Sequence, residues 1–141
     1  MTWAHARLDA SAGKAVPLPP VIETLKLGGL DRWCAGQVDK IWYPAPELLN
    51  VDGSLFGGYL AALADQMLAF AAMTVVPADR MFRTVNLQIG FFHVARAEPL
   101  HLTAEVVAQT RRMISCRVAF RTAEGLLIAE ATAQQIVLPL S

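Results

Sequence analysis

The sequence predicts an α+β domain in which an antiparallel sheet packs against one long, buried helix. The helix is predicted by a run of 22 residues, from Leu55 to Val76, in which Asp65 is the single charged side chain. The sheet is predicted by segments after that run in which apolar and polar residues alternate with a period of two, separated by short turns. The length of 141 residues corresponds to about one domain.

The apolar run is long enough to cross a bilayer, but its composition favours a buried helix of a globular domain. Asp65 and Gln66 lie at its centre, where an unpaired carboxylate would be costly in hydrocarbon. Gly57 and Gly58 near its start suit a turn, and no cluster of Lys or Arg marks a cytoplasmic side. We therefore expect a helix from about residue 56 or 57 to Met73, wrapped on most sides, and no association with a membrane.

Alternation and turn residues predict four or five strands. Val85, Leu87 and Ile89 are predicted to share one face of the strand that follows the helix. The tight turn at Glu124 and Gly125 is predicted to connect the last two strands. The expected strands are 33–43, 83–91, 102–109, 113–121 and 126–138.

Residues 1–30 are predicted to form an N-terminal arm or a short helix outside the domain. The prolines at 17, 19 and 20 break any regular element there, and residues 21–27 fit a short helix that ends at Gly28 and Gly29. Residues 31–141 are expected to form the single domain.

Charge balance and apolar content limit the classes of partner. The chain has 12 Lys and Arg against 12 Asp and Glu, and a chain without a basic surplus is not expected to bind nucleic acid. With 55% hydrophobic and 17% charged residues, it is too apolar for an ordinary small monomer. We expect the excess apolar surface to be buried between copies of the chain in a homo-oligomer with two-fold symmetry.

The cysteines and histidines show no pattern of a metal site or a disulfide framework. Cys34 and Cys116 lie far apart, and His5, His93 and His101 lack the spacing of metal ligands. No metal and no bound cofactor are therefore expected. The first residues lack the apolar stretch of a secretory signal, so we expect a cytoplasmic protein with two buried thiols.

Three features of the predicted helix and the loop before it point to chemistry. Asp65 is a candidate general base or nucleophile if it is desolvated, and a solvated or ion-paired Asp is an equal alternative. Backbone amides at Gly57 and Gly58 can approach a developing negative charge, although such a pair more often forms a tight turn. Asn50 can donate its side-chain amide to a carbonyl, and is otherwise a turn residue.

Together these residues form a specific pattern. The segment Asn50-Val51-Asp52-Gly53-Ser54-Leu55-Phe56-Gly57-Gly58, with Asp65 eight residues after Gly57, resembles the hot-dog fold acyl-CoA thioesterases of the phenylacetate-degradation (PaaI-like) type. The resemblance runs from about Trp33 to Leu138. It implies an antiparallel sheet curled around a central helix, and active sites between the two subunits of a homodimer, alone or paired into a homotetramer.

The resemblance also implies a reaction, the hydrolysis of an acyl-CoA or a related acyl thioester to a free acid and a thiol. The Gly57 amide and the Asn50 side chain would polarise the thioester carbonyl. Asp65, contributed by the other subunit, would activate water or attack directly. Thr84 matches a position where a hydroxyl orients the water. Coenzyme A enters as part of the substrate.

Further residues of the pattern are expected to bind the substrate. Phe56 and Gly58 lie beside Gly57, and the turn with Arg111 and Arg112 matches a region that contacts the phosphates of coenzyme A. The same two arginines also fit an ordinary exposed turn.

One residue departs from the family pattern. Where family members carry His before the two glycines, this chain has Phe56, and a phenyl ring cannot donate a hydrogen bond. Two alternatives stay open, and Phe56 supports the first of them. One is a non-catalytic acyl-CoA binding protein. The other is a hydratase or dehydratase, which pairs a His with an acid and for which His93 is a candidate.

Overall fold

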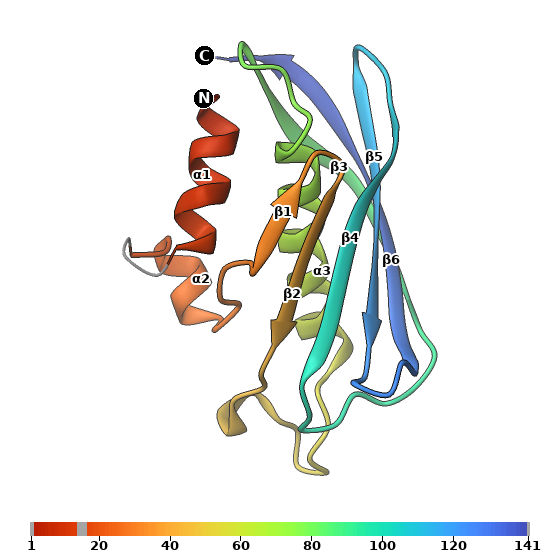
Figure 1. The fold of residues 1–141 in the computed structure, drawn as a ribbon. Coiled ribbons are helices and arrows are strands. Elements are labelled where there is room, and N and C mark those ends of the chain that lie inside the picture. Colours follow the sequence, from red (N-terminus) through yellow and green to blue (C-terminus); the bar gives the residue numbers. More distant parts are fainter. Residues whose placement is uncertain (1, 14–16, 141) are drawn as a thin grey trace.

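A six-stranded antiparallel sheet curves around helix α3 (Gly57–Met73) in the computed structural model, which describes residues 2–13 and 17–140. Two N-terminal helices lie beside α3, on the side away from strands β5 and β6 (Figure 1). The predicted α+β class is therefore confirmed, and so are the predicted bounds of the long helix. No described helix is long and apolar enough to cross a membrane.

Every pair of neighbouring strands in the sheet is antiparallel. Strand β3 lies at one edge, and no described strand pairs with its outer side. A short 3-10 helix (Pro46–Leu48) precedes the loop that leads into α3. The spatial order of the strands is β1 (Arg32–Cys34), β2 (Gln37–Trp42), β4 (Leu100–Gln109), β5 (Met113–Arg121), β6 (Leu127–Pro139) and β3 (Arg80–Phe91).

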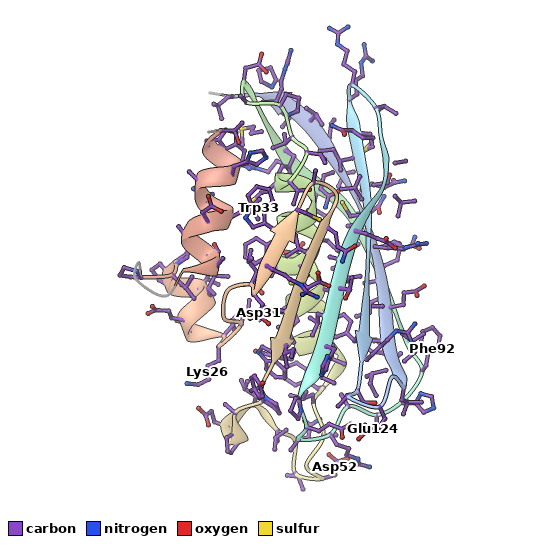
Figure 2. All side chains as sticks on the ribbon, in the orientation of Figure 1. Lys26, Asp31, Trp33, Asp52, Phe92 and Glu124 are labelled. Carbon is purple, nitrogen blue, oxygen red and sulfur yellow. The ribbon has the colours of Figure 1, made fainter. Side chains whose placement is uncertain are left out.

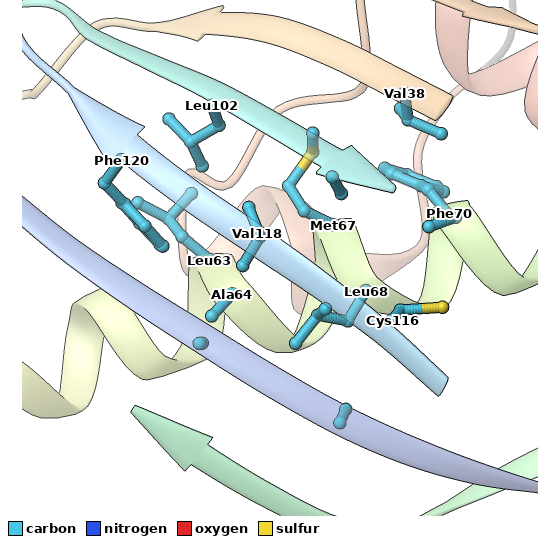
Figure 3. Packing of buried hydrophobic residues seen from close by; sticks show 14 of the residues in the cluster. Val38, Leu63, Ala64, Met67, Leu68, Phe70, Leu102, Cys116, Val118 and Phe120 are labelled. Carbon is cyan, nitrogen blue, oxygen red and sulfur yellow. The ribbon is translucent and has the colours of Figure 1, made fainter. Parts of the chain in front are cut away.

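The core lies between α3 and the inner face of the sheet. Leu63, Met67 and Leu68 of the helix are completely buried, and they pack among inward side chains of the strands, such as Val118 and Phe120 (Figure 3). The alternating buried positions of β5 follow the predicted pattern. Because the sheet covers only one side of the helix, the other side of α3 is left for the N-terminal helices.

The first predicted strand, 33–43, is two strands. Gly36 adopts a φ of 88°, which turns the chain between β1 and β2, and Trp33 pairs with Val38. A single extended segment could not contain that left-handed residue. The prediction of two buried thiols is wrong for Cys34, which is exposed in the short edge strand, whereas Cys116 is buried.

A β-bulge interrupts the predicted alternation of β3. Thr84 pairs with Gln135 and Asn86 pairs with Gln134, so Val85 is an extra residue between them. Thr84 therefore shares the face of the buried Gln135, which is directed at α3. Val85 is 54% exposed and does not share a regular face with the residues that follow it.

The described part of the N-terminal arm (residues 1–30) forms two helices, and residues 1 and 14–16 lie outside the described residues. Helix α1 (Trp3–Ala12) is capped by the Thr2 side chain, which accepts from His5 N at 3.0 Å. Helix α2 (Pro20–Thr24) is shorter than the predicted 21–27, because Lys26 takes a φ of 55°. Pro17 and Pro19 lie between the two helices, whereas Pro20, which was expected to break a regular element, is the first residue of α2, where a helix tolerates proline.

Candidate active site

The N-terminus of α3 offers unpaired backbone amides. Its N-cap residue, Phe56, has no side-chain acceptor of the kind that a Ser or Asp provides. Tyr59 and Leu60 donate to the Phe56 carbonyl at 3.1 and 3.3 Å, whereas Gly57 and Gly58 donate to no acceptor among the described residues. The positive end of the helix dipole lies at the same place. This terminus can therefore stabilise a negative charge that develops on a bound oxygen.

Aromatic rings cover the two glycines. A Cβ on Gly57 would lie 2.9 Å from Cζ of Phe91, and one on Gly58 would lie 3.0 Å from Cε2 of Phe56. Gly57, Phe91 and His93 line a recess of about 390 Å³, which we call the amide recess. Larger residues at positions 57 and 58 would displace these rings, and because Gly57 and Phe91 line the recess, its shape depends on the glycine at position 57.

The loop before α3 is folded into a turn that engages the Asn50 side chain. Asn50 N donates to Ser54 O at 2.7 Å, and Asn50 Nδ2 donates to Ser54 Oγ at 3.3 Å. Ser54 Oγ donates to Asp52 Oδ1 at 2.6 Å, and the bonds from Ser54 lower the pKa of Asp52. Asp52, at the tip of this loop in Figure 2, lines the amide recess together with Ser54, and Asn50 does not.

Asp65 lies about two helical turns beyond Gly57, in a separate hollow. A rise of 1.5 Å per residue over eight residues places the two about 12 Å apart along the helix axis. Asp65 lines a groove of about 720 Å³ between α3 and the arm, which we call the arm groove. Its carboxylate remains open to solvent in the single chain, but its partly buried position raises the pKa of Asp65 by desolvation. Gly57 and Asp65 of one chain therefore do not meet.

Gln66, the next residue, belongs to a buried network that sequence patterns did not predict. Lys40 Nζ, from β2, donates to Gln66 Oε1 at 2.5 Å and to the carbonyl oxygens of Leu27 and Gly29 at 2.7 and 3.1 Å. Gln66 Nε2 donates to the carbonyl of Gly28 at 2.5 Å. All three ammonium protons thus have acceptors, and these acceptors are uncharged oxygens.

The buried position of Lys40 changes its acidity. Only 5% of the residue is exposed, and desolvation lowers the pKa of Lys40 to about 7, although the charge of Asp31 acts in the opposite direction. A sequence pattern could have indicated this orientation. Lys40 lies two residues from Val38 and two from Trp42, which are both buried, so all three side chains face inward.

Five consecutive carbonyls, in residues 25–29 (the arm loop), accept hydrogen bonds from side chains of the domain. Tyr59 Oη donates to Leu25 O at 2.6 Å, and Trp42 Nε1 donates to Lys26 O at 3.0 Å. Lys40 and Gln66 supply the bonds to the remaining three. At its end, Gly29 lies so close to helix α1 that a Cβ would be 1.9 Å from a backbone oxygen there. The arm loop is therefore held rigidly against β2 and α3.

The remaining predicted site residues lie apart from Gly57. Thr84 is exposed on the edge strand β3, on the face directed at α3. Arg111 and Arg112 form the exposed β4–β5 turn, at the end of the molecule opposite the start of α3 (Figure 1). Within one chain, these arginines cannot reach a ligand bound at the amide recess.

His93 lies at the amide recess, which its position in the sequence does not reveal. Its Nδ1 is 3.0 Å from the carbonyl oxygen of Leu127. Because a carbonyl only accepts, this contact requires the proton on Nδ1 and leaves Nε2 of a neutral ring as an acceptor.

A model of the thioesterase superfamily matches residues 52–129, more than half of the chain. The chain belongs to the thioesterase superfamily. The match begins in the loop before α3 and includes Gly57, Asp65 and Thr84. The resemblance to these thioesterases in the sequence is thereby confirmed. No curated protein matches the sequence.

Solved structures share the fold of this thioesterase superfamily member. AziG from S. sahachiroi is 25% identical with a TM-score of 0.80, over 88% of this chain and 100% of that chain. A phenylacetic acid degradation-related protein from Ralstonia eutropha JMP134 is 24% identical with a TM-score of 0.80, over 96% and 99%. A hypothetical thioesterase protein from Streptococcus pneumoniae TIGR4, crystallised with coenzyme A, is 23% identical with a TM-score of 0.68, over 78% and 84%. These likenesses confirm the predicted hot-dog fold.

Proposed function

We propose that the protein hydrolyses acyl-CoA thioesters to a free acid and coenzyme A. The observation that carries this proposal is the pair of unpaired amides, at Gly57 and Gly58, at the N-terminus of α3, where Gly57 lines the amide recess. Such amides stabilise the oxyanion that forms when a thioester carbonyl is attacked. The fold is also that of a hypothetical thioesterase protein from Streptococcus pneumoniae that was crystallised with coenzyme A, which supports coenzyme A as the thiol part of the substrate.

The proposed active site is shared between two chains. Strand β3 is 12 residues long and its outer side is unpaired among the described strands, so a second copy can extend the sheet there by two-fold symmetry. Such an axis reverses the second chain. Asp65 of the partner subunit, which is about 12 Å too far along the helix within one chain, can then approach Gly57. The partner subunit's Arg111 and Arg112 move to the same end, where they would bind coenzyme A phosphates.

The reaction requires a group that first accepts a proton from water and then donates it to the leaving thiolate, and we assign both steps to Asp65. Water adds to the thioester carbonyl carbon, its proton passes to Asp65, and the Gly57 amide holds the negative charge on the carbonyl oxygen. The C–S bond then breaks, and the thiolate of coenzyme A takes the proton back from Asp65. Direct attack by the carboxylate oxygen is the alternative, with a mixed anhydride that water hydrolyses. In both routes Thr84 orients the water and Asn50, released from Ser54, donates to the carbonyl.

The test is hydrolysis of a panel of acyl-CoAs, with the released thiol measured by a thiol reagent. We expect D65N to lower kcat by about 10²- to 10⁴-fold, because the amide of Asn is not a base. The control is D79N, which changes an exposed Asp in the loop after α3. Equal activity of D65N and the unchanged protein would remove Asp65 from the mechanism.

Two observations favour other functions, and the same assay separates them. Phe56 in place of the family His favours a protein that binds acyl-CoA without hydrolysis. That function predicts tight binding of acyl-CoA and no thiol release on any chain length. His93 in the amide recess favours hydration of an enoyl-CoA, which predicts loss of the enoyl absorbance and no thiol release.

A further inference from the structure

The arm groove is a hollow along the side of α3 that the sheet does not cover. Its floor is formed by residues that recur at helical spacing on one face, among them Ala62, Asp65, Ala69 and Met73. Its outer wall is formed by the arm, including Leu25. The volume of about 720 Å³ lies within the range of pockets that hold small-molecule ligands.

Asp65 is the acidic group that lines this groove, and Arg7 is the basic one. Gln66 is occupied by Lys40 and Gly28, and the guanidinium of Arg7 lies 5.6 Å from the centre of the Trp3 ring. The described hydrogen bonds and ion pairs leave Asp65 without a partner, and desolvation is the named cause of its raised pKa. Most of the remaining lining is aliphatic or aromatic.

The space beside Asp65 exists because its neighbours on the helix face are small. Ala62 and Ala69 lie three residues before and four residues after Asp65, so they flank it on the floor of the groove. A larger side chain at either position would project into the hollow. The polar reacting group and the apolar hollow are therefore contiguous.

The outer wall is rigid enough to select by shape. Trp3 Nε1 donates to Arg80 O at 2.7 Å, which fixes the start of α1, and Trp33 Nε1 donates to Asp9 Oδ1 at 3.0 Å near its end. The arm loop is fixed by its five carbonyls. A pre-formed wall discriminates between ligands without the entropic cost of ordering a loop.

We propose that the arm groove binds the uncharged hydrocarbon part of the acyl group, so that the N-terminal arm determines which acyl chains are hydrolysed. The inference rests on the role of Asp65 in the proposed function. A thioester whose carbonyl is held at Gly57 of one protomer extends past Asp65 of its partner and into the groove beside that carboxylate. The occupant is a saturated acyl chain of medium length rather than a charged or strongly polar acid.

The test fills the groove without touching the proposed reacting groups. We expect A69L to lower kcat/KM for decanoyl-CoA by about tenfold or more and to leave acetyl-CoA hydrolysis within about twofold, since a short acyl group does not reach the leucine. A62L fills the same groove from a second position and should have the same effect on both substrates. The matched control is A123L, in the exposed turn between β5 and β6, which should change neither rate.

Binding of free decanoate, measured by titration calorimetry, separates this inference from the proposed function. If the unchanged protein binds decanoate and A69L does not, the groove is supported even when no thioester is hydrolysed. If A69L and A62L melt as the unchanged protein does and still bind decanoate equally, or lose activity equally on acetyl-CoA and decanoyl-CoA, the inference is wrong while thioesterase activity stands. If either variant unfolds, the other decides.

Discussion

Asp65 of α3 and Lys40 of β2 are two titratable side chains whose surroundings change their acidity in opposite senses. Loss of contact with water, partial for Asp65 and nearly complete for Lys40, favours the neutral form of each; it raises the pKa of the carboxyl and lowers the pKa of the ammonium to about 7. Asp65 faces an open groove, where a raised pKa suits a proton acceptor. Lys40 faces only backbone and amide oxygens, and there its hydrogen bonds hold the arm loop against β2 and α3.

The raised pKa of Asp65 predicts the acid limb of the rate profile. The base must be ionised, so kcat/KM should fall as the pH drops through a pKa above the ordinary value of about 3.9. We expect half-maximal activity clearly above that pH, measured between about pH 4 and 8 by chromatography of the released coenzyme A. A profile that stays flat to about pH 4 would show that Asp65 titrates normally or is not the base.

Lys40 predicts a pH-dependent stability. Its pKa in the folded protein, about 7, lies below the value of about 10.4 expected for the unfolded chain, so between them the unfolded chain binds more protons. The free energy of unfolding should therefore rise with pH from about 7 to 10 relative to K40M, which has no proton to lose. Denaturation by urea at several pH values measures the difference, and parallel curves for the two proteins would contradict it.

At the scale of elements, the unpaired backbone amides at the start of α3 make the helix less stable than a capped helix would be, but they leave N–H donors free for a substrate. A Ser at position 56 could accept from the Gly58 or Tyr59 amide, which stabilises helices by about 1 kcal/mol. We expect F56S to raise the free energy of unfolding by a part of that amount, since the exposed Phe56 ring also loses its edge contact with Tyr59. The same variant should hydrolyse acyl-CoA more slowly, because its hydroxyl competes with the substrate oxygen for the amides.

Thermal melting and the thiol assay measure the two effects of F56S on one preparation. F56A is the control, because it removes the ring without supplying an acceptor. If F56S becomes more stable and keeps full activity, the Gly58 amide is not one of the groups that hold the oxyanion.

Elements that depend on local pattern were predictable, and those that depend on distant partners were not. The helix at Gly57–Met73 and the strand at Met113–Arg121 follow from hydrophobic periodicity alone, and both have the predicted bounds. The ten-residue helix α1 was expected only as an arm or a short helix, because its docking depends on carbonyls as distant as that of Arg80. The bulge at Val85 leaves no mark in an apolar–polar pattern.

The candidate site follows the same division. Asp65, Gly57 and Asn50 could be named because their spacing matches a family, and their catalytic roles remain predictions. The inward direction of the Lys40 side chain could be predicted from the two-residue alternation of a β-strand. Its acceptors in the arm loop could not be predicted, because every residue has a backbone carbonyl and these atoms leave no pattern in the sequence.

At the scale of the whole molecule, a site shared between chains predicts complementation. D65N and G57V should each be inactive as homodimers, since one lacks the base and the other crowds the amide recess against Phe91. In a mixed dimer, the Gly57 of the D65N chain meets the Asp65 of the G57V chain. One intact site of two should therefore restore activity when the two chains are co-expressed with different tags and purified through both.

The outcome is unambiguous about where the site lies. If Gly57 and Asp65 acted within one chain, both sites of the mixed dimer would stay defective and no activity would return. Light scattering of the unchanged protein provides the companion measurement, and a monomer at micromolar concentration would contradict a shared site. V85K, on the exposed edge strand, should weaken the dimer and the activity together.

The arm loop is attached through atoms that every amino acid possesses. Its carbonyl oxygens accept hydrogen bonds from the side chains of Tyr59, Trp42, Lys40 and Gln66. The attachment therefore does not depend on the Leu25 side chain, which lines the groove. Natural variation at that position can therefore resize the cavity without loosening its wall. The main chain of the arm loop holds the wall in place, and the side chain at position 25 sets the size of the groove. A single substitution there can therefore change which acyl chains fit.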